Sequence, residues 1–114
     1  MAEVAEVRRA ALALPEAQEQ TRSGRTLFTV QGSVFAEVLP GGAHAVAFVD
    51  EAVVRDMVNE DPAVYTELWH GPDLVGVRIE VAVAPTRRLD QLIEFAWRRH
   101  APRSLESVLD ERRR

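Results

Sequence analysis

Arginine supplies all the permanently cationic side chains of this sequence, which contains no lysine. A guanidinium is planar and always charged, and it holds a carboxylate or a phosphate through two parallel hydrogen bonds. Residues 1–84 contain six arginines against 13 acids, whereas residues 85–114 contain eight against five. The C-terminal part is therefore basic within a chain of net charge −4. Arginine codon preference in a GC-rich genome explains the missing lysine equally well.

Seven arginines are candidate contacts for an anionic partner. Arg78 is the best single candidate, because it stands alone midway along one face of a predicted strand; a salt bridge to a neighbouring strand is the alternative. Arg87 and Arg88 lie at the positive end of a predicted helix dipole, an unfavourable place for cations that a phosphate or acidic partner would improve. The full set comprises Arg22, Arg25, Arg78, Arg87, Arg88, Arg98 and Arg99.

The segment DPAVYTELWHGPD, residues 61–73, indicates a second kind of site. Tyrosine and tryptophan are enriched where proteins recognise ligands and partners, although packing in the core is their commoner fate. A small-molecule or peptide pocket beneath this segment would have Tyr65, Trp69 and His70 as walls and Arg78 as the anchor for an anion. Such a pocket is compatible with an acidic protein.

Catalytic and metal-binding chemistry has little support in the sequence. The chain has no cysteine, so disulfides, thiolate catalysis and zinc sites with cysteine ligands are excluded. Its three histidines, at positions 44, 70 and 100, match no compact metal motif. Ser33, His44 and Glu37 could form a nucleophile, base and orienting group, but no GxSxG motif exists and a hairpin is poorly shielded from water. We therefore predict a non-enzymatic protein without a cofactor.

The first half of the chain predicts a helix followed by a three-stranded meander. Apolar residues at helical spacing predict a helix over residues 4–14, which Pro15 ends, and the polar residues 16–24 then form a connection. In RTLFTVQGSVFAEV, residues 25–38, a two-residue turn at Gln31-Gly32 would place Phe28 opposite Phe35. The second turn, at Pro40-Gly41, leads into the strand AVAFVD.

The length of that second turn determines one further contact. If it also has two residues, Glu37 lies opposite His44, close enough for the carboxylate to favour the imidazolium. The alternative is that both side chains lie in solvent at a sheet edge.

The second half predicts a helix, a strand and two more helices. Asp50 is a good N-cap for the helix at residues 51–60, and Pro62 begins a short helix that stops at Gly71-Pro72. Residues 74–84 alternate as a strand with one apolar face, in which Gly76 marks a bulge or a close approach by another group. Thr86 caps the long helix that ends near residue 101, and Ser104 caps the last one.

The chain length and the order of the predicted elements indicate one α+β domain spanning residues 1–114. Its helices pack on a twisted antiparallel sheet, and its elements follow the order α-β-β-β-α-β-α-α. With 114 residues, a core without disulfides is feasible. No apolar run approaches the roughly 20 residues of a membrane span, and the N-terminus lacks the apolar region of a signal peptide. We therefore expect a cytoplasmic protein without a membrane partner.

Four stretches, taken in order, are similar to the MmcQ/YjbR family. They are ALALPEAQE, GRTLFTVQGSVFAEV, DPAVY and FAWRRHAPRSL, and the resemblance covers about residues 4 to 109. It implies an α+β fold similar to frataxin-like folds. Members are often labelled DNA-binding because their architecture is similar to a double-wing arrangement, which is an analogy of fold.

The chain departs from the pattern of that family at two places. The third strand usually ends near a lysine, where this chain has Phe48. The fourth strand usually begins with a tryptophan, where this chain has Val75 and Gly76. If these positions bind anything in relatives, this protein binds it differently or not at all.

These observations predict a non-enzymatic binding module with two possible kinds of ligand. DNA is a candidate partner, with the hairpins as wings and the arginines on phosphates, yet a pI of about 5.4 argues against it. The alternative is a small molecule or a protein. A homodimer through Trp69 and Trp97 is not distinguished from a monomer, and the deciding observation is whether the arginines share a face.

Overall fold

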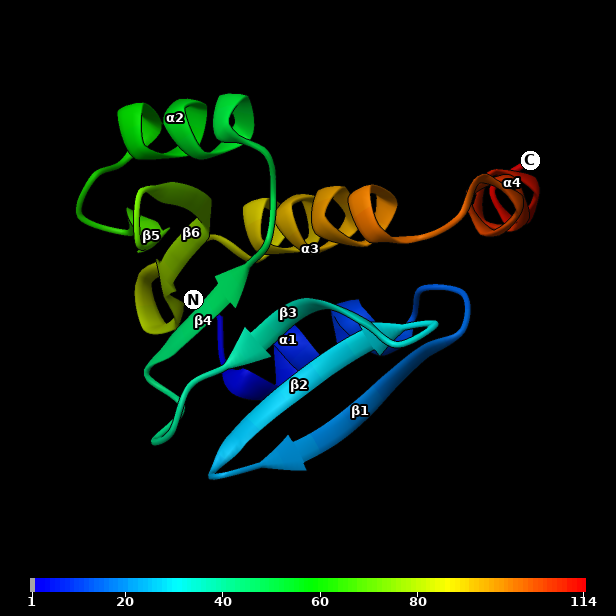
Figure 1. Cartoon of the computed structure of the whole chain (residues 1–114), viewed down its shortest axis with the longest axis horizontal. Helices are drawn as coiled ribbons and strands as arrows, with labels where there is room; N and C mark the ends of the chain where they lie inside the picture. Colours follow the sequence, from blue (N-terminus) through cyan, green and yellow to red (C-terminus); the bar gives the residue numbers. More distant parts are fainter. Residues whose placement is uncertain (1) are drawn as a thin grey trace.

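A computed structural model describes residues 2–114, which form a six-stranded antiparallel sheet and four α-helices (Figure 1). The expected α+β class is confirmed. The elements are α1 (Val4–Leu12), β1 (Ala17–Arg22), β2 (Arg25–Val30), β3 (Ser33–Val38), β4 (His44–Ala47), α2 (Glu51–Glu60), β5 (Tyr65–His70), β6 (Asp73–Glu80), a 3-10 turn at Val81–Val83, α3 (Thr86–His100) and α4 (Arg103–Arg112).

The sheet has the strand order β1-β2-β3-β4-β6-β5. Strands β1 to β4 form a meander, and α2 connects β4 to the edge strand β5, so β6 lies between β4 and β5 (Figure 1). No helix among residues 2–114 is long and apolar enough to cross a membrane.

Two strands lie where the sequence predicted other structures. Residues 16–24 were expected to connect, but Ala17–Arg22 pairs with β2 as an edge strand. Almost all of its residues are exposed, so the alternation that marks a half-buried strand is missing. The short helix expected after Pro62 is instead a turn followed by β5. In this turn, Asp61 Oδ1 accepts a hydrogen bond from Ala63 N at 3.2 Å. Pairing with β6 decides the strand conformation of this segment.

The β2–β3 hairpin turns at Gln31-Gly32 as expected, with both residues at positive φ and Val30 opposite Ser33. The predicted pairing of Phe28 with Phe35 is wrong by one residue, because a bulge at this point places Phe28 opposite Ala36. Both phenylalanines are nonetheless fully buried in one core.

The condition for a contact between Glu37 and His44, a two-residue second turn, is not met. The second turn is longer than two residues, so Glu37 lies opposite Val46. His44 lies opposite Glu80 of β6 instead, and its Nε2 is 3.0 Å from the Glu80 carboxylate.

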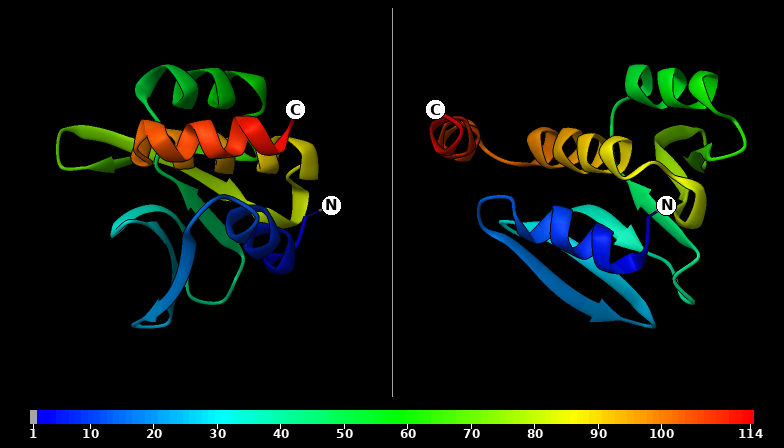
Figure 2. Two further views of the ribbon diagram at one scale, coloured as in Figure 1. Left: turned by 90° about the vertical axis from the view of Figure 1, so that its right-hand side faces the viewer. Right: turned by 180° about the vertical axis from the view of Figure 1, so that it is seen from behind.

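Helices α1, α2 and α3 pack on the sheet and bury its apolar face. Helix α1 contacts β1, β3 and α3, while α2 contacts β5 and β6; the view from behind shows α1 across the meander (Figure 2). One row of paired residues, comprising Phe28, Ala36, Ala47 and Val77, is fully buried on this side. Buried Trp97 of α3 donates its indole N–H to the Pro15 carbonyl at 3.1 Å, which joins α3 to the end of α1.

Helix starts agree with the sequence at one of three positions. Asp50 caps α2 by accepting a hydrogen bond from Val53 N at 3.0 Å. Thr86 and Ser104 do not cap, because the N-cap of α3 is Pro85, one residue before Thr86, and the N-cap of α4 is Pro102, two residues before Ser104. Each proline holds the extended backbone from which its helix starts.

At Gly76, the backbone at the end of β4 lies close against β6. A Cβ atom at Gly76 would lie 2.5 Å from the Ala47 carbonyl oxygen and 3.3 Å from Phe48 Cα. Both features that the sequence left open for this glycine are present. Leu68 pairs with Gly76 and Trp69 with Leu74, so the bulge residue Val75 adjoins Gly76, and the missing side chain permits the close approach. The position of the backbone at Ala47 and Phe48 therefore depends on the lack of a side chain at Gly76.

We expect Gly76→Ala to lower the free energy of unfolding by about 1–3 kcal/mol, because overpacking of this size forces the backbone to move. Urea denaturation followed by circular dichroism measures the change. Gly76→Ser, which adds the same Cβ, should cost a similar amount. A Gly76→Ala variant within about 0.5 kcal/mol of the wild type, the range of ordinary surface substitutions, would contradict this explanation.

Candidate functional site

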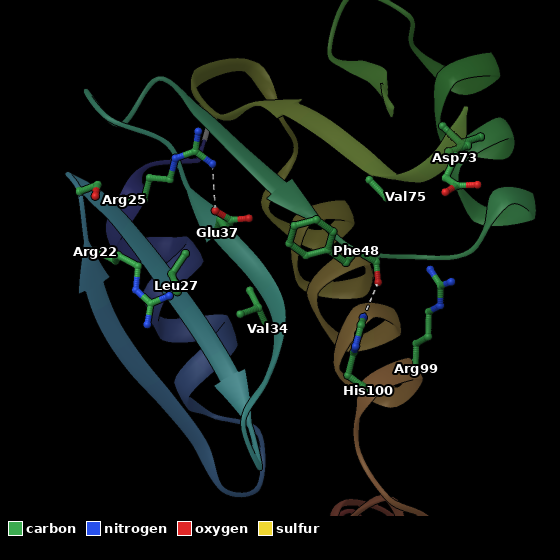
Figure 3. A pocket seen from close by; sticks show the side chains of 12 residues that line it. Arg22, Arg25, Leu27, Val34, Glu37, Phe48, Asp73, Val75, Arg99 and His100 are labelled. Atoms are coloured by element: carbon green, nitrogen blue, oxygen red, sulfur yellow. Dashed lines mark hydrogen bonds and ion pairs between the residues drawn. The ribbon is translucent and has the colours of Figure 1, made fainter. Parts of the chain in front are cut away.

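A cavity of about 950 Å³ opens between the β2–β3 hairpin and the end of α3 (Figure 3). In the sheet, successive side chains point to opposite faces, so Leu27 lies on the face opposite to buried Phe28. Leu27 and its partner Glu37 both line the cavity. The cavity therefore belongs to the face of the sheet that α1 and α3 leave open.

The walls of the cavity are largely apolar. Leu27 and Val34 come from the hairpin, Phe48 follows β4, and Leu74 and Val75 come from β6. Four of these side chains are partly exposed, while Leu27 is 9% exposed. Such a surface favours an apolar part of a ligand, since covering it removes hydrocarbon from water.

Three of the seven candidate arginines line this cavity. Arg22 and Arg25 lie opposite each other at the β1–β2 turn, and Arg99 comes from the last turn of α3. Arg25 Nη1 lies 3.4 Å from Glu37 Oε1, a weak contact. Within residues 2–114, Arg22 and Arg99 form no ion pair within 4.0 Å. With Glu37 and Asp73 also in the lining, the cavity retains a cationic excess.

His100 stands beside Arg99 and has a defined tautomer. Its Nε2 is 3.2 Å from the Phe48 carbonyl, which can only accept, so Nε2 carries the hydrogen. Burial lowers the pKa of His100, and the charge of Arg99 lowers it further, while the Phe48 hydrogen bond opposes both. The ring is therefore neutral at pH 7, and its Nδ1 is an acceptor.

A smaller hollow of about 440 Å³ adjoins the cavity and shares four of its residues, Arg25, Glu37, Phe48 and Val75. Its other walls are Leu68, Trp69 and His70 of β5. Trp69 is 50% exposed. The two hollows thus form one depression that runs from the β1–β2 turn to the edge strand.

The second predicted site, around residues 61–73, is only partly assembled. Trp69 and His70 line the smaller hollow, but Tyr65 is 1% exposed in the core, where its hydroxyl finds no partner and burial raises its pKa. Arg78 is exposed between Val46 and Thr66 in the sheet register, and it lines neither hollow. Trp97 is fully buried, so it is unavailable to the dimer interface considered from the sequence.

The remaining candidate arginines lie away from the cavity. Arg87 and Arg88 lie at the start of α3, beside a separate hollow of about 380 Å³, and Arg88 pairs with Glu60 of α2 through Nε at 2.8 Å. Eleven residues separate Arg88 from Arg99, about 16 Å along a helix. The seven arginines therefore do not share one face.

Arg98 is the centre of a network that joins α3 to α4. Its guanidinium contacts Glu94 at 3.0 Å, Asp110 at 2.8 Å and Glu106 at 3.5 Å. Arg113 also pairs with Glu94, and these two arginines lower the pKa of that carboxyl. Arg98 thus has a structural role.

Sequence reasoning missed the apolar walls and His100. One signal was nonetheless present, because Phe48 and Val75, the positions at which the chain departs from the MmcQ/YjbR pattern, line both hollows. Leu27 and Val34 gave no such signal, since their alternation with core residues resembles that of any strand.

Comparison with known proteins shows a similar fold. The sequence matches no protein-family model, and no curated protein matches it. The structure is similar to the crystal structure of Deinococcus radiodurans protein DR2400, which has a DUF419 domain. The TM-score is 0.73 at 16% sequence identity, covering 85% of this chain and 77% of that chain. DUF419 is the MmcQ/YjbR-type family.

Arg98 and its neighbour Arg99 should differ in their effect on stability. We expect Arg98→Gln to lower the free energy of unfolding by about 1 kcal/mol, because three carboxylates lose their shared partner. Arg99→Gln should change it by less than about 0.5 kcal/mol, as at ordinary surface positions. Urea denaturation of both variants measures the difference, and equal losses would contradict the assigned roles.

The lowered pKa of His100 predicts a pH dependence of stability. At a pH above the unfolded-state pKa, His100 is neutral in both the folded and the unfolded protein. As the pH falls through that value, the His100 imidazole of the unfolded chain binds a proton first. The stability that neutral His100 provides is therefore lost between the unfolded-state pKa of about 6.5 and the lower folded-state pKa.

His100→Gln retains a side-chain donor for the Phe48 carbonyl but does not titrate. We expect the wild type to lose more stability than this variant between pH 8 and pH 5, measured by urea denaturation at each pH. Parallel pH profiles would show that burial of His100 does not suppress its protonation.

Proposed function

We propose that this chain is a non-enzymatic binding module of MmcQ/YjbR type whose ligand is a small organic anion with an apolar body. The observation that carries the proposal is the position of Arg22, Arg25 and Arg99 around one cavity with apolar walls. The apolar body would cover Leu27, Phe48 and their neighbours. The anionic group would accept hydrogen bonds from the guanidiniums.

The size of the cavity supports a small molecule. Ligand pockets commonly measure about 300–1,000 Å³, are lined by apolar side chains and hold a few polar groups that orient the ligand. The volume of about 950 Å³ lies at the upper end of that range. Local cationic charge also explains how a protein of net charge −4 attracts an anion.

The arrangement of arginines favours this ligand over DNA. Binding to a duplex depends on many phosphate contacts along one surface. Here Arg88 already binds Glu60 and Arg98 already binds three carboxylates, at two places away from the cavity. The cationic groups around the cavity are few, which suits a single anionic group better than a polyanion.

The absence of catalysis is also part of the proposal. His44 contacts Glu80, and Glu37 contacts Arg25. The Glu37 carboxylate therefore does not orient the His44 imidazole. Ser33 lies at the β2–β3 turn, four residues along β3 from Glu37. At a strand rise of about 3.3 Å per residue, roughly 13 Å separates their backbones, which is too far for a hydrogen-bonded triad.

Titration with octanoate, monitored by ¹H–¹⁵N NMR, tests the proposed site. We expect shifts at the backbone amides of Leu27, Phe48 and Val75, and weaker binding by octanamide, which has the same chain without the charge. Arg22→Gln and Arg25→Gln, at two positions that face each other across the β1–β2 turn, should each weaken octanoate binding about tenfold or more, because a charge-assisted hydrogen bond contributes about 1.5–3 kcal/mol. Arg78→Gln, an exposed arginine outside both hollows, is the matched control and should bind as the wild type does.

Two results would overturn the proposal. One is octanoate binding that is absent or unaffected by both cavity variants. The other is binding of duplex DNA, by fluorescence anisotropy, with a log affinity that falls linearly with log salt and weakens in an Arg87→Gln/Arg88→Gln variant.

A further inference from the structure

Trp69 presents a large apolar ring beside a charged group. It lies on the edge strand β5, is 50% exposed, and lines the smaller hollow together with Phe48 and Arg25. Its indole N–H donates only a long hydrogen bond, 3.4 Å, to Glu67. Half of the Trp69 surface is therefore in water, in a hollow that a second aromatic residue, Phe48, also lines.

The two ends of the depression differ in charge. In the smaller hollow, Arg25 lies near Glu37 and the two charges offset each other. The larger cavity adds Arg22 and Arg99, against Asp73. An anionic group is therefore favoured at the larger cavity. The carboxylate of Glu37, shared by both hollows, would repel a second anion near Trp69.

We propose that the ligand is a planar aromatic anion, with its ring on Trp69 and Phe48 and its carboxylate or phosphate on Arg22 and Arg25. Stacked or edge-to-face aromatic pairs contribute binding free energy in addition to that of the area that they bury. An alkyl chain provides only the contribution of the buried area. Arg25, which lines both hollows, connects the anionic end to the aromatic end. This inference rests on the proposed function and adds the chemical class of the ligand's body.

The chain offers a direct reporter for this contact. Its two tryptophans give two indole N–H signals, and Trp97 is fully buried with its N–H bonded to Pro15. Only the Trp69 signal should respond to a ligand in the smaller hollow. Trp69→Phe removes that signal and thereby assigns it.

The experiment compares 2-naphthoate with octanoate, two monoanions that differ in the shape of the apolar body. We expect 2-naphthoate to bind at least fivefold more tightly and to shift the Trp69 indole signal while leaving that of Trp97 in place. Trp69→Leu should weaken 2-naphthoate at least fivefold and octanoate less than twofold; Trp69→Phe should retain most of the preference. A thermal melt of each variant verifies that it is folded. Because Trp69 is half exposed, its substitution should leave the fold intact.

The outcomes separate this inference from the proposed function. Equal binding of both anions, unchanged in Trp69→Leu, would overturn the aromatic class and leave a site for apolar anions in place. No binding of either anion would overturn both. A nucleotide and an aromatic carboxylate both combine a planar ring with an anionic group. Adenosine monophosphate, added as a third probe, distinguishes a nucleotide phosphate from an aromatic carboxylate as the source of the anion.

Discussion

The backbone approach at Gly76 is the constraint on which the open face of this sheet depends. Because Gly76 has no side chain, the Ala47 carbonyl and Phe48 lie directly against β6. Phe48 then leaves the sheet toward α3, where its carbonyl accepts the hydrogen bond of His100. One missing methyl group thus brings together β4, β6 and the last turn of α3, which supply one side of the cavity. The β2–β3 hairpin supplies the other.

The distribution of arginine charge follows from the packing of the helices. Helix α4 brings Glu106 and Asp110 to Arg98, and α2 brings Glu60 to Arg88, so these guanidiniums bind acids of the same chain. Arg99, one residue beyond Arg98, points to another side of α3 because successive residues are about 100° apart around a helix. Two adjacent arginines therefore have different roles. One joins helices and the other faces the cavity.

The similarity to DR2400 supports the α+β architecture but leaves the ligand to be argued from the residues. At 16% identity, the likeness concerns the fold, and one fold supports many functions. The ligand class proposed for this chain comes instead from the charge and shape of its own cavity.

The sequence by itself determined the fold class, the β2–β3 turn, the cap at Asp50 and the long apolar stripe of α3, because each depends on local periodicity or on a single residue type. It did not reveal β1, whose residues are polar, or β5, whose strand conformation depends on pairing with β6. It also misplaced Phe35 by one residue, since a bulge arises from how two strands pair.

For the site, the sequence identified Arg22, Arg25, Arg99, Trp69 and His70 as available for binding, but not which of them meet. Only the tertiary structure decided that the first three surround one cavity, that Tyr65 and Trp97 are buried, and that Arg78 stands apart. The physical reason is that convergence and burial depend on contacts between residues far apart in the chain. The type of a residue sets what it can bind, and the packing of the sheet against α3 sets whether it is available.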